Sequence, residues 1–163
     1  MPGIRVVVVD DEQLAREELC FLLGQAGNLE IVGQAKDGVE ALRLSGELKP
    51  DVVFLDVQMP GLTGFEVARR LLVVDAPPQL VFVTAFDQYA VDAFSVNAVD
   101  YLLKPVDLVR LSQTLDRARR RLIRVVWVVG QIELLAASTI DDGRLRIDTS
   151  GEQSRPVFSV NGA

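Results

Sequence analysis

The sequence predicts an α/β protein with a five-stranded parallel sheet that is covered by helices on both faces. Two observations lead to this prediction. Short runs of β-branched residues alternate with longer amphipathic stretches, and this alternation repeats five times before residue 122. The composition, with 49% hydrophobic and 25% charged residues, is typical of a globular chain. Because crossovers between parallel strands are right-handed, we expect a doubly wound (βα)5 arrangement.

The first two strand–helix units occupy the N-terminal third of the chain. Val6–Val9 is a continuous apolar run, as expected of a strand that is buried on both faces. The first helix should carry its apolar residues on one stripe: Ala15, Leu19, Leu22, Leu23 and Ala26. Gly27–Asn28 is expected to end this helix. Leu29–Ala35 then predicts the second strand, and Val39–Leu48 the second helix.

Proline-containing breaks separate the remaining units. Lys49–Pro50–Asp51 precedes the third strand, and Ala76–Pro77–Pro78 precedes the fourth. The expected elements, in chain order, are Val52–Leu55, Phe65–Val73, Leu80–Val83, Tyr89–Phe94, Tyr101–Leu103 and a fifth helix. The fifth helix carries apolar residues at spacings of three and four: Leu108, Leu111, Leu115, Ala118 and Leu122.

Composition excludes several classes of function. The net charge of −6 argues against a broad nucleic-acid-binding surface. The absence of histidine excludes histidine metal ligands and histidine general bases. A single cysteine, Cys20, excludes an internal disulfide and fits a reducing compartment. No signal peptide and no uncharged stretch of membrane-spanning length is visible, so we expect a cytoplasmic protein without membrane contact.

Polar residues follow four of the five expected strands. Asp10–Glu12 follows the first, Asp56 the third, Thr84 the fourth and Lys104 the fifth. In doubly wound folds, ligands bind beyond the carboxyl ends of the strands. Carboxylates brought together there would repel one another unless a cation lay among them, and their oxygens suit Mg²⁺. With a lysine and a hydroxyl added, the groups match the needs of phosphoryl transfer.

Four segments resemble the receiver domain of bacterial response regulators, and the resemblance covers about residues 4 to 122. They are Val6–Glu12 (VVVVDDE), Phe54–Gly64 (FLDVQMPGLTG), Val83–Ala85 (VTA) and Tyr101–Pro105 (YLLKP). The resemblance implies a flavodoxin-like sheet with strand order 2-1-3-4-5. It also implies that residues 1–122 form a phosphoacceptor domain.

The resemblance further implies which residues accept the phosphoryl group and hold the metal. Asp56 would be the phosphoacceptor, attacking phosphorus as a carboxylate nucleophile. Asp11 would be a direct ligand of Mg²⁺, Asp10 its acidic companion, and Asp56 a further ligand. The backbone carbonyl of Gln58 would complete the protein's share of the metal shell.

The remaining roles concern the switch. Thr84 and Lys104 would contact phosphoryl oxygens, and the Lys104–Pro105 peptide bond would be cis. Tyr101 would turn inward when Thr84 moves, so that new charge at Asp56 biases a two-state element. The implied partners are a sensor histidine kinase and a second copy in a homodimer. The protein would act as a switch and not as a turnover enzyme, although its site would assist its own phosphorylation and dephosphorylation.

A narrower resemblance lies in Thr84–Asp107 (TAFDQYAVDAFSVNAVDYLLKPVD), which is similar to the LytTR (LytR/AlgR) subfamily. Receivers of that subfamily precede a DNA-binding domain, which implies transcription regulation by the full-length protein. Residues 123–163 are too few for such a domain. We therefore expect a linker or tail there, or the truncated start of an output domain. DNA contact would require the missing part.

The tail permits more than one structure. Val125–Ala137 is apolar and either extends the fifth helix or, with its β-branched run, forms a strand. Packing on the receiver and pairing with a second copy are further alternatives for this segment. Asp141–Gly143 predicts a tight turn before the alternating Leu145 and Ile147. Ser150–Ala163 is expected to be loop or disorder.

Plainer interpretations stand beside these. Asp10–Glu12 would also suit a simple helix N-cap, and Lys104 a surface lysine before a turn. Arginines late in the fifth helix, from Arg117 to Arg124, fit a solvated helix end better than a nucleic-acid contact, given the acidic chain. Two other functions compete: a scaffold receiver that acts by protein binding, and an aspartyl-phosphate phosphotransferase or phosphatase. Enzymes of the latter kind usually carry a second Asp where this chain has Gln58.

Overall fold

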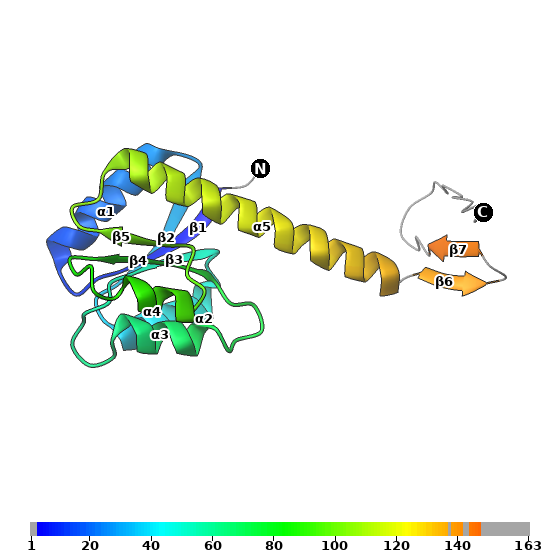
Figure 1. The fold of residues 1–163 in the computed structure, drawn as a ribbon, viewed down its shortest axis with the longest axis horizontal. Helices are drawn as coiled ribbons and strands as arrows, with labels where there is room; N and C mark the ends of the chain where they lie inside the picture. The colour runs from blue at the N-terminus through cyan, green and yellow to red at the C-terminus, as the bar shows by residue number, and fades with distance from the viewer. Residues whose placement is uncertain (1–2, 137, 142–143, 148–163) are drawn as a thin grey trace. The chain divides into compact units, whose positions relative to one another are not determined.

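The protein is built on a five-stranded parallel sheet with the order β2-β1-β3-β4-β5, so the prediction of fold and strand order is confirmed (Figure 1). This computed structural model describes residues 3–136, 138–141 and 144–147. The chain forms two compact units, Met1–Arg120 and Arg121–Ala163. The sheet lies in the first unit, and its strands are β1 (Ile4–Val9), β2 (Leu29–Ala35), β3 (Val52–Leu55), β4 (Gln79–Thr84) and β5 (Asp100–Leu103).

Five helices connect or follow these strands. They are α1 (Gln13–Ala26), α2 (Gly38–Leu48), α3 (Gly64–Leu71), α4 (Ala90–Ser95) and α5 (Leu108–Ala136). In Figure 1, α1 and the first turns of α5 lie on one face of the sheet, and α2, α3 and α4 lie on the other. Helix α3 begins one residue before the predicted Phe65. The reason is a capping box, in which the Thr63 hydroxyl accepts from the Glu66 N–H and the Glu66 carboxylate accepts from the Thr63 N–H.

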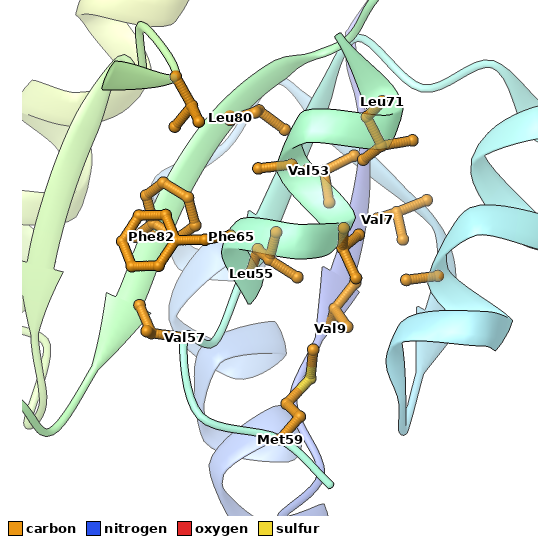
Figure 2. Packing of buried hydrophobic residues seen from close by; sticks show 14 of the residues in the cluster. Val7, Val9, Val53, Leu55, Val57, Met59, Phe65, Leu71, Leu80 and Phe82 are labelled. Carbon is orange, nitrogen blue, oxygen red and sulfur yellow. The ribbon is translucent and has the colours of Figure 1, made fainter. Parts of the chain in front are cut away.

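Alternate residues of the central strands form the core against α2, α3 and α4 (Figure 2). The strand residues of this cluster are Val7, Val9, Val53, Leu55, Leu80 and Phe82. From α3, the Phe65 ring packs on the Phe82 ring with a centroid distance of 4.7 Å. The β1 valines that alternate with this set are also fully buried, which explains why β1 reads as a continuous apolar run. Each buried side chain of this size contributes about 1.5–3 kcal/mol to folding.

Helix α5 continues beyond Leu122, where the predicted fifth helix ended, and reaches Ala136. The strand alternative for Val125–Ala137 is therefore wrong, and the alternative of a helical extension is confirmed as far as Ala136. The β-branched run follows Leu122 and Arg124, which have good helix propensity, and the helix continues through Gly130 because the segment contains no proline.

The second unit also contains a two-stranded antiparallel sheet of β6 (Ser138–Asp141) and β7 (Arg144–Ile147). These strands flank the turn that the sequence predicts, since Asp141 pairs with Arg144. The two residues between them and the stretch Ser150–Ala163 lie outside the described residues. Among the described residues, none of the helices has the length and apolar character that crossing a bilayer requires.

Candidate functional site

Three aspartates meet at the carboxyl edge of the sheet. Strands β1 and β3 are parallel neighbours, with Val9 opposite Leu55, so the residues that follow them lie side by side. The Asp56 N–H donates to the carbonyl of Val9 at 3.0 Å. Carboxylate oxygens of Asp10, Asp11 and Asp56 all lie within 4.8 Å of one another. Asp10 and Asp56 are buried, whereas Asp11 is exposed and leaves the cluster open on one side.

Lys104, which directly follows β5, brings a positive charge to these carboxylates at the same edge of the sheet. Its Nζ lies 2.6 Å from Asp10 Oδ2 and 3.4 Å from Asp56 Oδ2. The Lys104 backbone N–H donates to the Thr84 carbonyl at 2.9 Å, which continues the pairing of β5 with β4. The peptide bond between Lys104 and Pro105 is cis. The lysine is therefore a partner of the buried carboxylates and not a free surface cation.

Burial and the charge of Lys104 or its carboxylate partners shift the pKa values of Asp56 and Lys104 in opposite directions. Burial raises the pKa of Asp56 above its usual range, Lys104 opposes this increase, and the nearby Asp10 adds to it. For Lys104, burial acts to lower the pKa, but the bonds to Asp10 and Asp56 outweigh burial and raise the pKa above its usual value. The site thus keeps its lysine charged, while the Asp56 carboxylate carries an electrostatic cost that a bound cation would relieve.

The loop between β1 and α1 is held by hydrogen bonds to Asp10. Its Oδ1 accepts from the Glu12 N–H at 2.9 Å, and its backbone carbonyl accepts from Arg16 Nη1 at 2.7 Å. Glu12 is the N-cap residue of α1 and makes no side-chain capping bond. The acidic cluster is thus more than a helix cap. Sequence reasoning missed Arg16, whose only signal was its place one turn into an expected helix.

The other predicted residues surround the loop between β4 and α4. Thr84 is fully buried, and its hydroxyl accepts from the Phe86 N–H at 3.4 Å. The Tyr101 hydroxyl donates to the Phe86 carbonyl. The Gln58 side chain donates to the Tyr89 hydroxyl at 2.9 Å. The structure thus brings Asp10, Asp11, Asp56 and Lys104 into one cluster. Tyr101 and Gln58 each form a hydrogen bond with the loop between β4 and α4.

The donor set fits a small divalent cation. Three carboxylates converge and a single lysine contacts two of them, so negative charge is in excess. Oxygen ligands from a few carboxylates, with the remaining positions open to water or phosphate, are what Mg²⁺ prefers. The exposed Asp11 gives an ion a route from solvent.

Comparison with known families agrees with this geometry. The family model described as "response regulator receiver domain" matches residues 6–116. The chain belongs to the response regulator receiver family. Response regulators of this kind work in two-component systems, where the receiver is a phosphoacceptor switch.

Relatives of this receiver are response regulators about twice as long. An uncharacterized response regulatory protein from Vibrio cholerae serotype O1 is 50% identical over 118 residues, which are 72% of this chain and 49% of the relative. The sensory transduction protein LytT of Bacillus anthracis is 48% identical over 118 residues, covering 72% of this chain and 48% of LytT. The transcriptional regulatory protein BtsR of Shigella flexneri is 48% identical over 117 residues, with the same coverage of 72% and 48%. The LytT names support the LytTR resemblance.

Solved receiver structures share the fold. The response regulatory domain of mrkE from Klebsiella pneumoniae superposes with a TM-score of 0.68 at 36% identity, covering 72% of this chain and 97% of that chain. The receiver domain of AraT from Geobacillus stearothermophilus gives a TM-score of 0.68 at 30% identity, with coverages of 76% and 98%.

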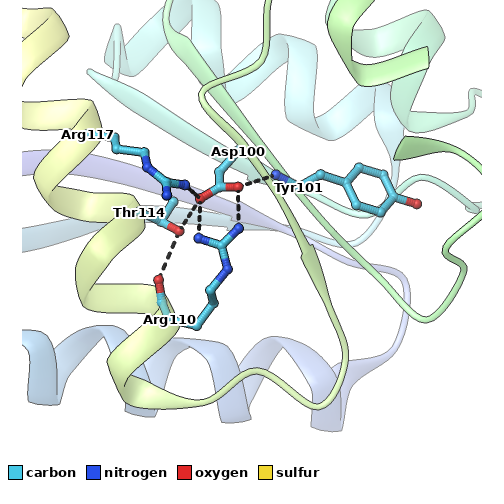
Figure 3. A network of polar contacts seen from close by, with 5 residues as sticks. All are labelled: Asp100, Tyr101, Arg110, Thr114 and Arg117. Carbon is cyan, nitrogen blue, oxygen red and sulfur yellow. Dashed lines mark hydrogen bonds and ion pairs between the residues drawn. The ribbon is translucent and has the colours of Figure 1, made fainter. Parts of the chain in front are cut away.

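A second polar cluster of this receiver links β5 to α5 (Figure 3). The Asp100 carboxylate is largely buried and accepts a two-pronged pair of bonds from Arg110, at 2.9 and 2.7 Å. Thr114 Oγ1 and the Tyr101 N–H donate to it at 2.8 and 2.9 Å, and Arg117 forms a further ion pair with it. Burial acts to raise the pKa of Asp100, but the bonds from Thr114, Tyr101 and Arg110 outweigh burial and lower it. Sequence reasoning missed this cluster.

The raised pKa of Asp56 predicts that replacing its charge stabilises the receiver. A group with a raised folded-state pKa contributes stability that is present below its unfolded pKa, about 3.9, and is lost as the pH rises through the folded value. Asp56→Asn should therefore raise the free energy of unfolding at pH 7 when no divalent cation is present.

Thermal melts in chelator between pH 4 and pH 8 measure this. The difference in melting temperature between Asp56→Asn and the wild type should shrink toward pH 4, because Asp56 becomes protonated in the wild type while the asparagine does not titrate. Mg²⁺ should raise the melting temperature of the wild type more than that of the variant. A variant that melts below the wild type at pH 7 in chelator would contradict the electrostatic account.

Proposed function

We propose that Asp56 is the phosphoacceptor of this receiver, and that its phosphorylation by a sensor histidine kinase changes the output of a longer response regulator. The observation that carries the proposal is the meeting of Asp56 with Asp10, Asp11 and Lys104 at one edge of the sheet. Three carboxylates beside one lysine form a site that attracts a cation and, through the cation and the lysine, a phosphoryl group.

In the reaction, an Asp56 carboxylate oxygen attacks the phosphorus atom of the donor. A bond forms between this oxygen and phosphorus, the bond between phosphorus and the donor breaks, and the donor leaves with the bonding electrons. Lys104 is placed to balance charge on a phosphoryl oxygen because its Nζ is already 3.4 Å from Asp56 Oδ2. The buried Thr84 hydroxyl would donate a hydrogen bond to another phosphoryl oxygen. A Mg²⁺ ion held by Asp10, Asp11, Asp56 and the Gln58 carbonyl would neutralise negative charge on the phosphoryl group.

The proposed switch starts at Thr84 and Tyr101. Phosphorylation draws the Thr84 hydroxyl toward the new oxygens, which disturbs its contact with the Phe86 N–H. Tyr101 contacts the same loop through the Phe86 carbonyl. Its side chain therefore responds to any change in that loop. This supports a two-state arrangement of the loop and of α4, with the phosphoryl group biasing the balance.

The remaining parts of the proposal concern the whole protein. The chain spans about half the length of the curated relatives it matches. We take residues 1–122 as the receiver and residues 123–163 as a linker or the beginning of an output region. By analogy with the names LytT and BtsR, the full-length output is transcription regulation through DNA, with a homodimer as the active form. Transfer from a kinase and contact with DNA would both take place in the cytoplasm. The receiver itself acts as a switch and not as a turnover enzyme.

Intact mass after incubation with acetyl phosphate and Mg²⁺ tests the acceptor. The wild type should gain the mass of one phosphoryl group, and the gain should disappear in chelator. Asp56→Asn should gain none, because an amide oxygen is a far weaker nucleophile than a carboxylate. Asp51→Asn is the matched control: Asp51 precedes β3, at the opposite end of the strand from Asp56, so this variant should label as the wild type does. No gain in the folded wild type would favour the scaffold receiver instead.

A further inference from the structure

The backbone carbonyl of Asp10 is held by a side chain from the first turn of α1. Arg16 Nη1 donates to this carbonyl at 2.7 Å, across the loop that joins β1 to α1. The Arg16 backbone N–H donates to the Glu12 carbonyl at 3.0 Å, so the residue is anchored in the helix from which its side chain reaches back. Because the Asp10 carbonyl belongs to the planar peptide that joins Asp10 to Asp11, this bond fixes the orientation of that peptide.

The orientation of this peptide sets the direction of the Asp11 side chain. The Asp10 carboxylate has hydrogen bonds of its own, from the Glu12 N–H at 2.9 Å and from Lys104 Nζ at 2.6 Å. The Asp11 carboxylate is exposed, and the hydrogen bonds and ion pairs between the described residues include none to it. Its place in the carboxylate cluster therefore depends on how the backbone beside it is held.

The charge of Arg16 does not serve the helix that carries it. A positive charge close to a helix N-terminus opposes the helix dipole, so the guanidinium does not stabilise α1 through its charge. Within the part of the chain that the structure describes, Arg16 forms no ion pair with a carboxylate. It provides a charge-assisted hydrogen bond to the Asp10 carbonyl, and such bonds are stronger than those between neutral groups.

We propose that Arg16 is a positioning residue, which orients the Asp10–Asp11 peptide so that both carboxylates face a divalent cation beside Asp56. The inference rests on the proposed function, because it concerns the Mg²⁺ site that phosphorylation of Asp56 would use. A peptide that is already held lowers the conformational entropy that is lost when Asp11 binds the ion. Loss of a partner that orients metal ligands in this way typically weakens metal binding about 10- to 100-fold.

The hydrogen bond and the charge of Arg16 act on cation binding in opposite directions. A guanidinium near the carboxylate cluster repels a divalent cation, so removal of the charge alone would tighten binding. Loss of the bond to the Asp10 carbonyl would weaken binding instead. The direction of the change in Mg²⁺ affinity therefore distinguishes a positioning role from simple electrostatic repulsion.

The test measures the dissociation constant of Mg²⁺ for the unphosphorylated full chain. Magnesium chloride is titrated while backbone amide signals of the folded protein are followed by NMR, so a loss of stability alone does not change the result. Arg16→Met removes the hydrogen bond and the charge, keeps a residue with good helix propensity, and should weaken Mg²⁺ binding about tenfold. Arg16→Lys keeps the charge and a donor group and should bind Mg²⁺ within about threefold of the wild type.

Arg119→Met is the matched control. Arg119 Nη2 also donates to a backbone carbonyl, that of Gly27 at the other end of α1, at 3.1 Å. This variant should leave the Mg²⁺ affinity unchanged, and melting temperatures in chelator report any loss of stability in each variant separately. A merely structural role of Arg16 would lower the melting temperature of Arg16→Met without changing its dissociation constant for Mg²⁺.

Three results would each overturn the positioning role and leave Asp56 as the acceptor. They are equal or tighter Mg²⁺ binding by Arg16→Met than by the wild type, equal weakening in Arg119→Met, and an Arg16→Lys variant that binds no better than Arg16→Met. A wild type that binds no Mg²⁺ would reject the metal site and the role of Arg16 together. Uptake of a phosphoryl group by intact mass tests Asp56 separately, so the two failures can be told apart.

Discussion

Gly64→Ala should destabilise this receiver by about 3–5 kcal/mol, a large share of the stability of a small domain. A Cβ atom at this position would lie 2.1 Å from the carbonyl oxygen of Asp56 and 2.9 Å from the Cα of Val57. These are backbone atoms, so no side-chain rotation relieves the clash. The Gly64 N–H also donates to the Val57 carbonyl at 2.8 Å, which keeps α3 close to the loop. The backbone of Asp56 would therefore have to move.

Gly46→Ala is the matched control because Gly46 lies within α2 and an added Cβ would meet nothing within 4 Å. Alanine favours the helix there, so this variant should gain up to about 1 kcal/mol. Chemical denaturation measures both changes. In the fraction of Gly64→Ala that remains folded, phosphorylation by acetyl phosphate should also slow, because the Asp56 backbone is displaced. Equal stability of Gly64→Ala and the wild type would show that α3 can move away from Asp56 at little cost.

Asp100→Ala should cost about 3 kcal/mol, because it leaves several donors around a largely buried position without their acceptor. Arg110 and Arg117 are partly exposed and regain some hydration, which keeps the cost below that of a fully buried pair. The lowered pKa of Asp100 means that its contribution is present above its unfolded pKa, about 3.9, and is lost as the pH falls through the folded value.

Denaturation at pH 7 and at pH 3 tests both statements. The difference in free energy of unfolding between the wild type and Asp100→Asn should be smaller at pH 3, because the wild-type carboxylate becomes protonated. Asp116→Ala serves as the control, since Asp116 is exposed and pairs with Arg119 at the surface at 3.3 Å. It should change stability by less than about 1 kcal/mol. If Asp100→Ala lowered the free energy of unfolding by no more than Asp116→Ala does, Arg110, Thr114 and Arg117 would have found other partners.

The sequence predicted the sheet well because parallel strands buried on both faces produce continuous apolar runs, as in β1 and β3. It also predicted which site residues meet. In a parallel sheet all strands end at one edge, so knowing that Asp10, Asp56 and Lys104 follow strands is enough to bring them together. The helix boundaries were predicted less accurately. Because Thr63 forms a capping box, α3 begins at Gly64, one residue before the predicted start.

What the sequence did not reveal depends on side-chain direction between elements. The bonds of Arg16 to the Asp10 carbonyl and of Gln58 to Tyr89 require particular rotamers, and no local pattern encodes these. The Asp100 cluster requires a given rotation of α5 about its axis. The apolar run within Val125–Ala137 fits the periodicity of a helix and that of a strand, so the sequence pattern alone could not decide between these two structures.

The single lysine in the carboxylate cluster has a consequence for ion binding. Three carboxylates against one ammonium leave two excess negative charges, and a phosphoryl group on Asp56 would add another. Cation binding and phosphorylation are then coupled equilibria, because both depend on the negative charge of the same carboxylate cluster. By reciprocity, the factor by which Mg²⁺ favours the phosphorylated form is the factor by which that form binds Mg²⁺ more tightly. The phosphorylated receiver should therefore retain its cation at magnesium concentrations at which the unphosphorylated receiver has released it.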